Sequence, residues 1–132
     1  MQKTIPTPVI RQDDYQLLSS YIDKNVFLSA IERNNVQKLK GELERSQVVN
    51  TDEFPGDTVR LYSRVKIRTE ERGDTMEMTL VPPGEVDRKA NKISILAPIS
   101  IALLGFRQGQ RVTWKMPTGL RTYTILEVYN DR

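Results

Sequence analysis

Apolar residues in the first third of the chain recur at the spacing of an α-helix. Tyr15, Leu18 and Ile22 lie three and four residues apart, which predicts an amphipathic helix of about three turns. After an ambiguous stretch, a second apolar stripe predicts another helix over about 31–48. Two such helices in succession predict a short antiparallel helical hairpin, with the apolar seams of a coiled coil, over residues 1–50.

The pattern changes to alternation after residue 50. A linker rich in proline, glycine and acidic residues at 51–57 separates the two patterns. From Val59 to Ile67 the apolar residues occupy odd positions, so a bent strand or a strand pair with one buried face is predicted. The even positions predict a basic face, which carries Arg60, Arg64, Lys66 and Arg68.

Two β-hairpins account for the rest of the alternation. Residues 75–80 are predicted to return antiparallel to the first strand, and 111–116 to pair with 120–129. The inward positions are predicted to belong to the core and carry Met76, Met78 and Trp114. Residues 51–132 are therefore expected to form a mostly antiparallel sheet module, which makes the whole chain an α+β protein.

A strand and a helix follow each other between the two hairpins. Residues from Lys92 to Ile95 alternate between polar and apolar, and Pro98 stands where the first turn of a helix needs no backbone donor. Gly105 can take the left-handed conformation that ends such a helix. One short helix is therefore expected within the sheet module.

Charge and composition exclude several kinds of site. The 132 residues include 20 Lys+Arg and 17 Asp+Glu, and neither half of the chain is a basic arm, so the charge does not predict bulk nucleic-acid binding. Direct sequence-specific binding of nucleic acid is not expected either. Without cysteine and histidine the chain lacks thiolate and imidazole groups, so no metal ligand, cofactor site or catalytic residue is predicted. No segment approaches the roughly 18 apolar residues of a membrane span. A cytoplasmic protein is expected.

A series of motifs in fixed order resembles the GreA/GreB family of transcript-cleavage factors. The motifs are Asn35 to Arg45, Ser63 to Ile67, Thr79 to Val81, Lys92 to Ile95, Ala97 to Ile99, Ala102 to Gly105, Gly109 and Trp114. Within the family the chain most resembles the short-arm branch called regulator of nucleoside diphosphate kinase (Rnk). The resemblance implies an FKBP-like C-terminal module that docks at the rim of the secondary channel of bacterial RNA polymerase. It also implies an N-terminal coiled coil directed into that channel.

The predicted hairpin is short for a cleavage factor. Such a factor needs a long coiled coil that brings acidic residues to the polymerase active site, where they help to hold a magnesium ion. At about 1.5 Å per residue, helices of this length reach roughly 20 to 25 Å. The carboxylates near the predicted turn are Asp23 and Glu32, whose spacing does not suit a metal pair. They are interpreted as helix-end charges or as contacts of the arm turn, and cleavage stimulation is not expected.

The resemblance places the docking contact just before the short helix. The family pattern of cleavage factors at this point is similar to Asp-Ser-Pro, whereas this chain has Leu96-Ala97-Pro98. Docking through this corner would therefore be more apolar. Leu96 is interpreted either as core packing or as an exposed contact, and Ile99 extends the same apolar corner. Electrostatic support is expected from the basic face, unless that face is solvated and paired with its neighbours. The residues proposed for this support are Arg64, Lys66 and Arg68.

These observations predict a non-catalytic transcription regulator that binds RNA polymerase and excludes longer, channel-entering factors sterically. One alternative is a peptidyl-prolyl isomerase, because the expected fold is shared with FKBP enzymes, although the module has few aromatic residues. Another is a regulator of a different protein, such as nucleoside diphosphate kinase. The sequence does not predict the oligomeric state or the sign of the effect on transcription.

Overall fold

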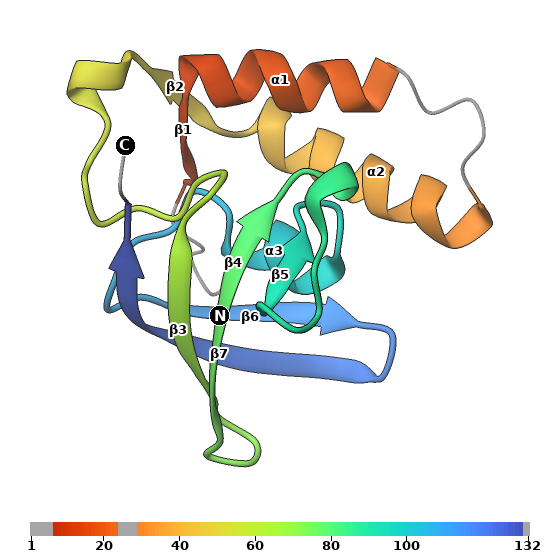
Figure 1. The fold of residues 1–132 in the computed structure, drawn as a ribbon, viewed down its shortest axis with the longest axis vertical. Coiled ribbons are helices and arrows are strands. Elements are labelled where there is room, and N and C mark those ends of the chain that lie inside the picture. The colour runs from red at the N-terminus through yellow and green to blue at the C-terminus, as the bar shows by residue number, and fades with distance from the viewer. Residues whose placement is uncertain (1–6, 24–28, 131–132) are drawn as a thin grey trace, which may run out of the picture.

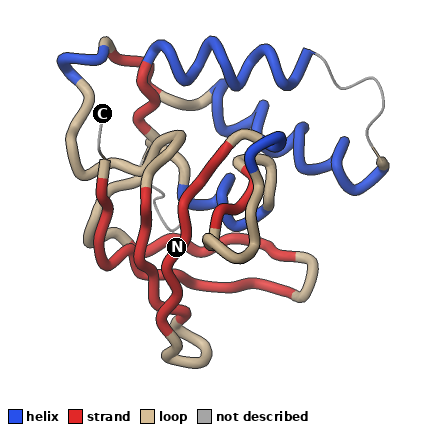
Figure 2. Tube along the Cα trace, viewed as in Figure 1, coloured by secondary structure: helices blue, strands red, loops and turns tan. Residues whose placement is uncertain are grey.

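The computed structural model describes residues 7–23 and 29–130, which form a helical hairpin and a curled five-stranded sheet (Figure 1). The two long helices lie along one end of the molecule and most strands at the other, while the short helix lies beside the sheet between them (Figure 2). The helices are α1 (Gln12–Asp23), α2 (Ala30–Glu44) and α3 (Pro98–Leu103), with 3₁₀ turns at Thr51–Glu53 and Pro83–Glu85. The predicted α+β class, with its helical hairpin and one short helix beside the sheet, is confirmed.

The five strands of the sheet lie in the spatial order β5-β4-β3-β7-β6. Their bounds are Arg64–Thr69 (β3), Thr75–Val81 (β4), Lys92–Ser94 (β5), Arg111–Met116 (β6) and Gly119–Tyr129 (β7). Strands β4 and β5 pair in parallel, and the other neighbours pair antiparallel. Both predicted β-hairpins are confirmed. A register shift between β3 and β7 next to Lys66 adds to the bend of the sheet.

The chain after α2 differs from the prediction. The helix ends at Glu44, whereas the apolar stripe predicted it to continue to about residue 48. Residues Gln47–Val49 instead form β2, which pairs in parallel with β1 (Val9–Arg11). The N–H of Gln47 donates to the carbonyl of Pro8 at 2.9 Å. Short-range periodicity could not reveal this pairing, because the two strands are separated by the whole hairpin.

Gly105 forms the contact between the N-terminal segment and the end of α3. Its φ is +86°, so the predicted left-handed conformation is confirmed. A Cβ atom on this residue would lie 2.5 Å from the Cβ of Pro8, and its carbonyl accepts the N–H of Val9 at 2.9 Å. Glycine is therefore required both by the backbone conformation and by the close approach of Pro8.

The hairpin and the sheet share one apolar core. Leu39 and Leu43 of α2 are buried in the same cluster as Val65 of β3 and Ile101 of α3. Helix α2 thus packs against α3 as well as against α1. The division into a hairpin over residues 1–50 and a sheet module over residues 51–132 stays a prediction.

The residues predicted to lie in the core have different environments. Met78 is 3% exposed, and Trp114 packs partly buried against the core, as the alternation predicted. Met76 is 45% exposed, so the prediction for this residue is wrong. Strand β5 pairs only with residues 79–81 of β4, which leaves the earlier part of β4 without a neighbouring strand on that side.

Arg60 is buried, and the prediction that it lies on an exposed basic face is wrong. Residues 59–63 lie outside the strands, and Tyr62 has a φ of +73°, which interrupts the alternation. Arg60 is 5% exposed, and its Nε and Nη2 donate to the two carboxylate oxygens of Asp14 in α1 at 2.9 and 2.8 Å. This buried ion pair joins the hairpin to the sheet module.

Candidate functional site

The predicted docking corner lies where β5 leads into α3. It consists of Leu96, Ala97, Pro98 and Ile99. Pro98 is the first residue of α3, as the sequence predicted. Ser94 shapes the turn before it, because its hydroxyl accepts the N–H of Leu96 at 3.0 Å and its carbonyl accepts the hydroxyl of Ser100 at 2.7 Å. All four corner residues are partly exposed, and Leu96 also packs against the core, so it combines both environments that the sequence left open.

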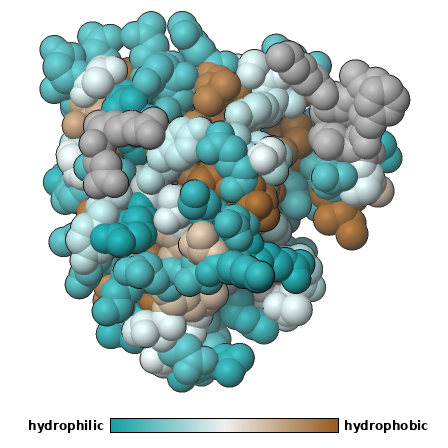
Figure 3. Space-filling model, viewed as in Figure 1, coloured by the Kyte–Doolittle hydropathy of each residue, from teal (hydrophilic) through white to brown (hydrophobic). Residues whose placement is uncertain are grey.

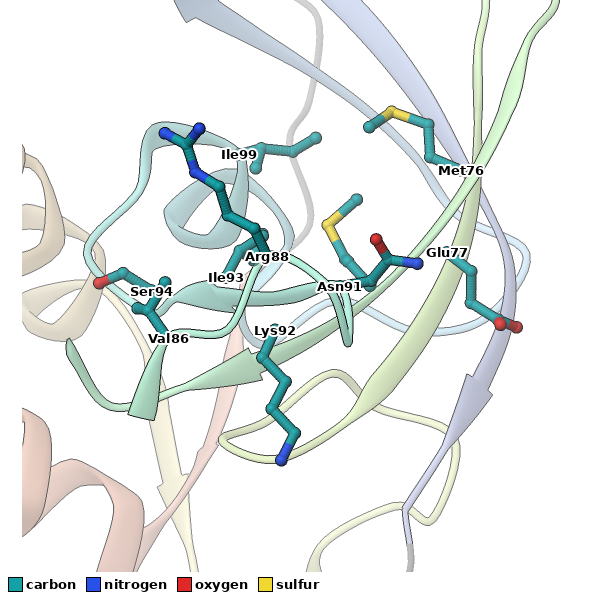
Figure 4. A pocket seen from close by; sticks show the side chains of 10 residues that line it. Met76, Glu77, Val86, Arg88, Asn91, Lys92, Ile93, Ser94 and Ile99 are labelled. Atoms are coloured by element: carbon teal, nitrogen blue, oxygen red, sulfur yellow. The ribbon is translucent and has the colours of Figure 1, made fainter. Parts of the chain in front are cut away.

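A pocket of about 360 Å³ opens beside the docking corner, between α3 and the β4–β5 edge of the sheet (Figure 4). We call it the β5 pocket. Its apolar lining consists of Met76, Met78, Val86, Ile93 and Ile99. Its polar lining consists of Glu77, Arg88, Asn91, Lys92 and Ser94. Ile99 belongs to both the docking corner and the β5 pocket, so the two form one continuous surface.

The predicted basic stripe lies on the other face of the sheet. It consists of Arg64, Lys66 and Arg68. Val65 and Ile67, which alternate with them along β3, are fully buried in the core that α3 also enters. Because successive side chains of a strand point to opposite faces, the stripe projects away from α3. The structure therefore does not bring the basic stripe and the docking corner together.

Each cation of the basic stripe has a neighbour within the sheet. The Arg64 guanidinium lies 4.6 Å from the centroid of the Tyr129 ring, Arg68 pairs with Glu70 at 3.6 Å, and Lys66 lies opposite Glu77 and Glu127 on the adjacent strands. This arrangement agrees with the interpretation of the stripe as a solvated face paired with its neighbours. Its field at a distance is correspondingly weakened.

The two arm-turn carboxylates occupy different positions at the end of the hairpin. Glu32 accepts the backbone N–H of Ser29 at 3.0 Å, and the N–H of Glu32 donates to the Ser29 hydroxyl at 3.2 Å, which forms a capping box at the start of α2. The hydrogen bond from the Ser29 N–H lowers the pKa of Glu32. Asp23 is the last residue of α1 and lines a small cleft between the helices with Lys40 and Glu44. The predicted turn at 24–28 lies outside the described residues.

Two further findings concern residues 7–23 and 29–130. Within these ranges, no three side chains of the histidine, cysteine, aspartate and glutamate types come together as a group able to hold a metal ion. No helix in the described part of the chain has both the length and the apolar character needed to span a bilayer.

Sequence reasoning missed the β5 pocket. Val86 and Arg88 lie in a stretch that the sequence showed only as a charged loop, and Met76 was predicted to be core. The signal that could have pointed to the pocket is the shortness of the strand motif at Lys92, which cannot cover all of the preceding hairpin strand.

Sequence comparison shows which known proteins this chain is similar to. Residues 54–130 match the family model described as the C-terminal part of transcription elongation factor GreA/GreB. Regulator of nucleoside diphosphate kinase from Escherichia coli is 38% identical over 91 residues, which are 68% of this chain and 67% of that protein. Transcription elongation factor GreA from Azorhizobium caulinodans is 29% identical over 101 residues, 76% of this chain and 64% of that protein.

A solved structure extends the similarity to the hairpin. The prokaryotic transcription elongation factor GreA/GreB from Nitrosomonas europaea superimposes with a TM-score of 0.74 and 34% sequence identity, over 96% of this chain and 100% of that chain. The resemblance drawn from the sequence motifs is thereby confirmed. The chain belongs to the GreA/GreB family.

Proposed function

We propose that this protein is a transcription regulator that binds bacterial RNA polymerase at the rim of its secondary channel and competes there with transcript-cleavage factors. Membership of the GreA/GreB family supports a role in transcription, and the names of the relatives include both elongation factors and a regulator of nucleoside diphosphate kinase. In this proposal the sheet module, which we expect to be FKBP-like, carries the docking corner. The protein itself does not stimulate cleavage.

The observation that carries this proposal is the limited reach of the helical hairpin. Helix α2 has 15 residues and is about 22 Å long. Its residues Val36, Leu39 and Leu43 are buried, so a large part of the helix lies against the rest of the molecule. The part of α2 that comes before its first buried residue, Val36, is residues 30–35, which make about 9 Å of helix. A hairpin of this kind can occupy a channel entrance but is too short to bring carboxylates to a distant metal ion.

The arm-turn carboxylates support the same conclusion. The Glu32 carboxylate accepts the N–H of Ser29 in the capping box and so stabilises the start of α2. Binding a metal ion would compete with this contact. Asp23 lies at the end of the other helix. We therefore assign Asp23 and Glu32 to the ends of the helices, and not to cleavage.

Competition for core RNA polymerase tests this proposal directly. Labelled protein should bind core polymerase, and a cleavage factor of the family should displace it in a concentration-dependent way. The double variant Leu96→Ala, Pro98→Ala should bind more weakly, whereas Leu120→Ala, on a 65% exposed residue at the far β6–β7 turn, should bind normally. Absence of polymerase binding, or stimulated hydrolysis of backtracked transcripts, would contradict the proposal.

The prolyl-isomerase alternative is disfavoured by the chemistry of the β5 pocket. FKBP enzymes surround proline with many aromatic side chains, whereas the apolar part of this lining is aliphatic and thioether-rich, and no aromatic ring lines the pocket. We expect no turnover above background in a prolyl-isomerase assay on a model peptide. Direct regulation of nucleoside diphosphate kinase is suggested by the name of one relative, and a pull-down with the purified kinase would test it.

A further inference from the structure

The β5 pocket combines an adaptable apolar floor with an open mouth. Met78 in its lining is 3% exposed and Ile93 is partly exposed, whereas Met76 and Val86 are 45% and 47% exposed. Near the centre of the face shown in Figure 3, apolar surface interrupts the hydrophilic surface over the region of β5. Methionine side chains are flexible and polarizable, so they can adjust to apolar groups of different shape. Such a surface suits the insertion of a side chain from a partner better than an enclosed small-molecule site.

One cationic side chain gives this pocket a preference for negative charge. In Figure 4, Arg88 rises beside Ile99 at the mouth of the pocket, while Lys92 and Glu77 extend away from the other lining residues. Within the described part of the chain Arg88 forms no ion pair, in contrast to Arg68 on the opposite face. A guanidinium with free donors beside an apolar pocket matches a carboxylate that neighbours an aliphatic side chain.

We propose that the β5 pocket binds a segment of a partner protein that presents an aliphatic side chain next to a carboxylate. The aliphatic group enters between Met76, Met78 and Ile99, and the carboxylate pairs with Arg88. Ile99 also belongs to the docking corner, so the partner in this proposal is RNA polymerase. For that identity alone the inference rests on the proposed function. The chemistry of the pocket itself is independent of that identity.

The test uses a synthetic peptide with a central leucine flanked on each side by two aspartates. Methyl groups of Met76 and Ile99 are followed by NMR while the peptide is titrated into the full-length protein to millimolar concentration. Saturable shifts confined to this surface are expected. Replacing the leucine by alanine should weaken binding by about tenfold or more, because the lost apolar contact dominates. A peptide that keeps the leucine but has lysines in place of the aspartates should bind more weakly than the leucine–aspartate peptide.

Matched variants of the protein separate the pocket from general electrostatics. Arg88→Glu should weaken binding of the aspartate peptide by about fivefold or more, while Arg68→Glu, which changes the net charge equally on the opposite face, should change it by less than about twofold. Met76→Ala should weaken binding, and Leu120→Ala, which removes an exposed apolar side chain elsewhere, should not. Equal effects of Arg88→Glu and Arg68→Glu, or no saturable shifts at the pocket, would overturn the inference.

Repeating the four variants in the polymerase-binding assay distinguishes this inference from the proposed function. If the protein binds polymerase but Arg88→Glu and Met76→Ala bind it normally and the peptide does not bind, then the pocket inference fails and the proposed function stands. If the peptide binds at the pocket but polymerase does not bind the protein, the proposed function fails and the pocket chemistry stands.

Discussion

The basic residues at even positions between 60 and 68 lie in two different environments. Arg60 is buried at the base of the hairpin, where its side chain is 6% exposed and that of Asp14 is 4% exposed. Arg64, Lys66 and Arg68 lie on the open face of the sheet with neighbours that are themselves exposed to solvent or partly so. Residue type and spacing therefore do not decide the role of a cation. The partner supplied by the fold decides it.

The difference in burial makes the two regions unequal in energy. Removing one member of a buried ion pair leaves the other charge without water or a partner, which costs far more than the intact pair contributes. An exposed pair has water as an alternative partner, so its loss costs little. Substitutions in the two regions should therefore separate clearly in the free energy of unfolding.

The largest expected effect comes from breaking the buried pair on one side. Arg60→Met leaves the Asp14 carboxylate buried and should lower the free energy of unfolding by about 3–5 kcal/mol. The matched control Arg64→Met, four residues further along the same chain, should lower it by less than about 1 kcal/mol. Urea unfolding followed by circular dichroism measures both. Adding Asp14→Leu to Arg60→Met should restore much of the loss, because no uncompensated charge is then buried.

Equal losses in Arg60→Met and Arg64→Met would show that the comparison between the two regions is wrong. Additive effects in the double variant would show that Asp14 and Arg60 do not act as a pair.

A second attachment of the hairpin base gives the next effect in size. Gly105→Ala forces a side chain into a left-handed conformation and places its Cβ 2.5 Å from the Cβ of Pro8. Gly109→Ala is the control, because Gly109 has a φ of +94° but no atom within 4 Å of the added Cβ. The conformational cost, roughly 1–2 kcal/mol, is common to both variants. The free energy of unfolding of Gly105→Ala should fall by a further amount of about 1 kcal/mol because of overpacking. Thermal unfolding measures the difference between the two variants. Equal losses would mean that the N-terminal segment moves away freely.

The sequence predicted those features whose cause lies within a few residues. Alternation located the two β-hairpins, Pro98 located the start of α3, and Gly105 located its end, because each is a local preference of the backbone. The β1–β2 pairing and the Asp14–Arg60 contact join segments 38 and 46 residues apart, as the register of Val9 with Gln47 and the ion pair show. No local pattern contains that information.

The candidate site was predictable to a similar extent. The sequence motif around Pro98 located the start of α3, and the four corner residues are partly exposed. The role of this corner in docking stays a prediction. The β5 pocket depends on where β5 stops relative to β4, and on which loop residues then stand beside Met76. These are consequences of register between elements, so the sequence pattern showed only an apolar methionine and a charged loop.

The smallest expected effect concerns Glu70, which pairs with Arg68 on the exposed face of the sheet. The hydrogen bond from the Thr124 hydroxyl is the main cause that lowers the pKa of Glu70, and the charges of Arg111 and Arg68 and the hydrogen bond from Arg68 each contribute less. Thr124→Val should therefore raise the pKa of Glu70 more than Arg68→Met does, which a pH titration of the Glu70 carboxyl by NMR would measure. Because the pKa of Glu70 is lower in the folded than in the unfolded protein, its ionised carboxylate stabilises the fold above the ordinary pKa of glutamate. This stabilisation is lost as the pH falls through the pKa of the folded state. If Arg68→Met instead moved this pKa more than Thr124→Val, the Arg68–Glu70 pair would be a stronger interaction than its exposure allows, and the contrast with the buried Arg60 would be smaller than we propose.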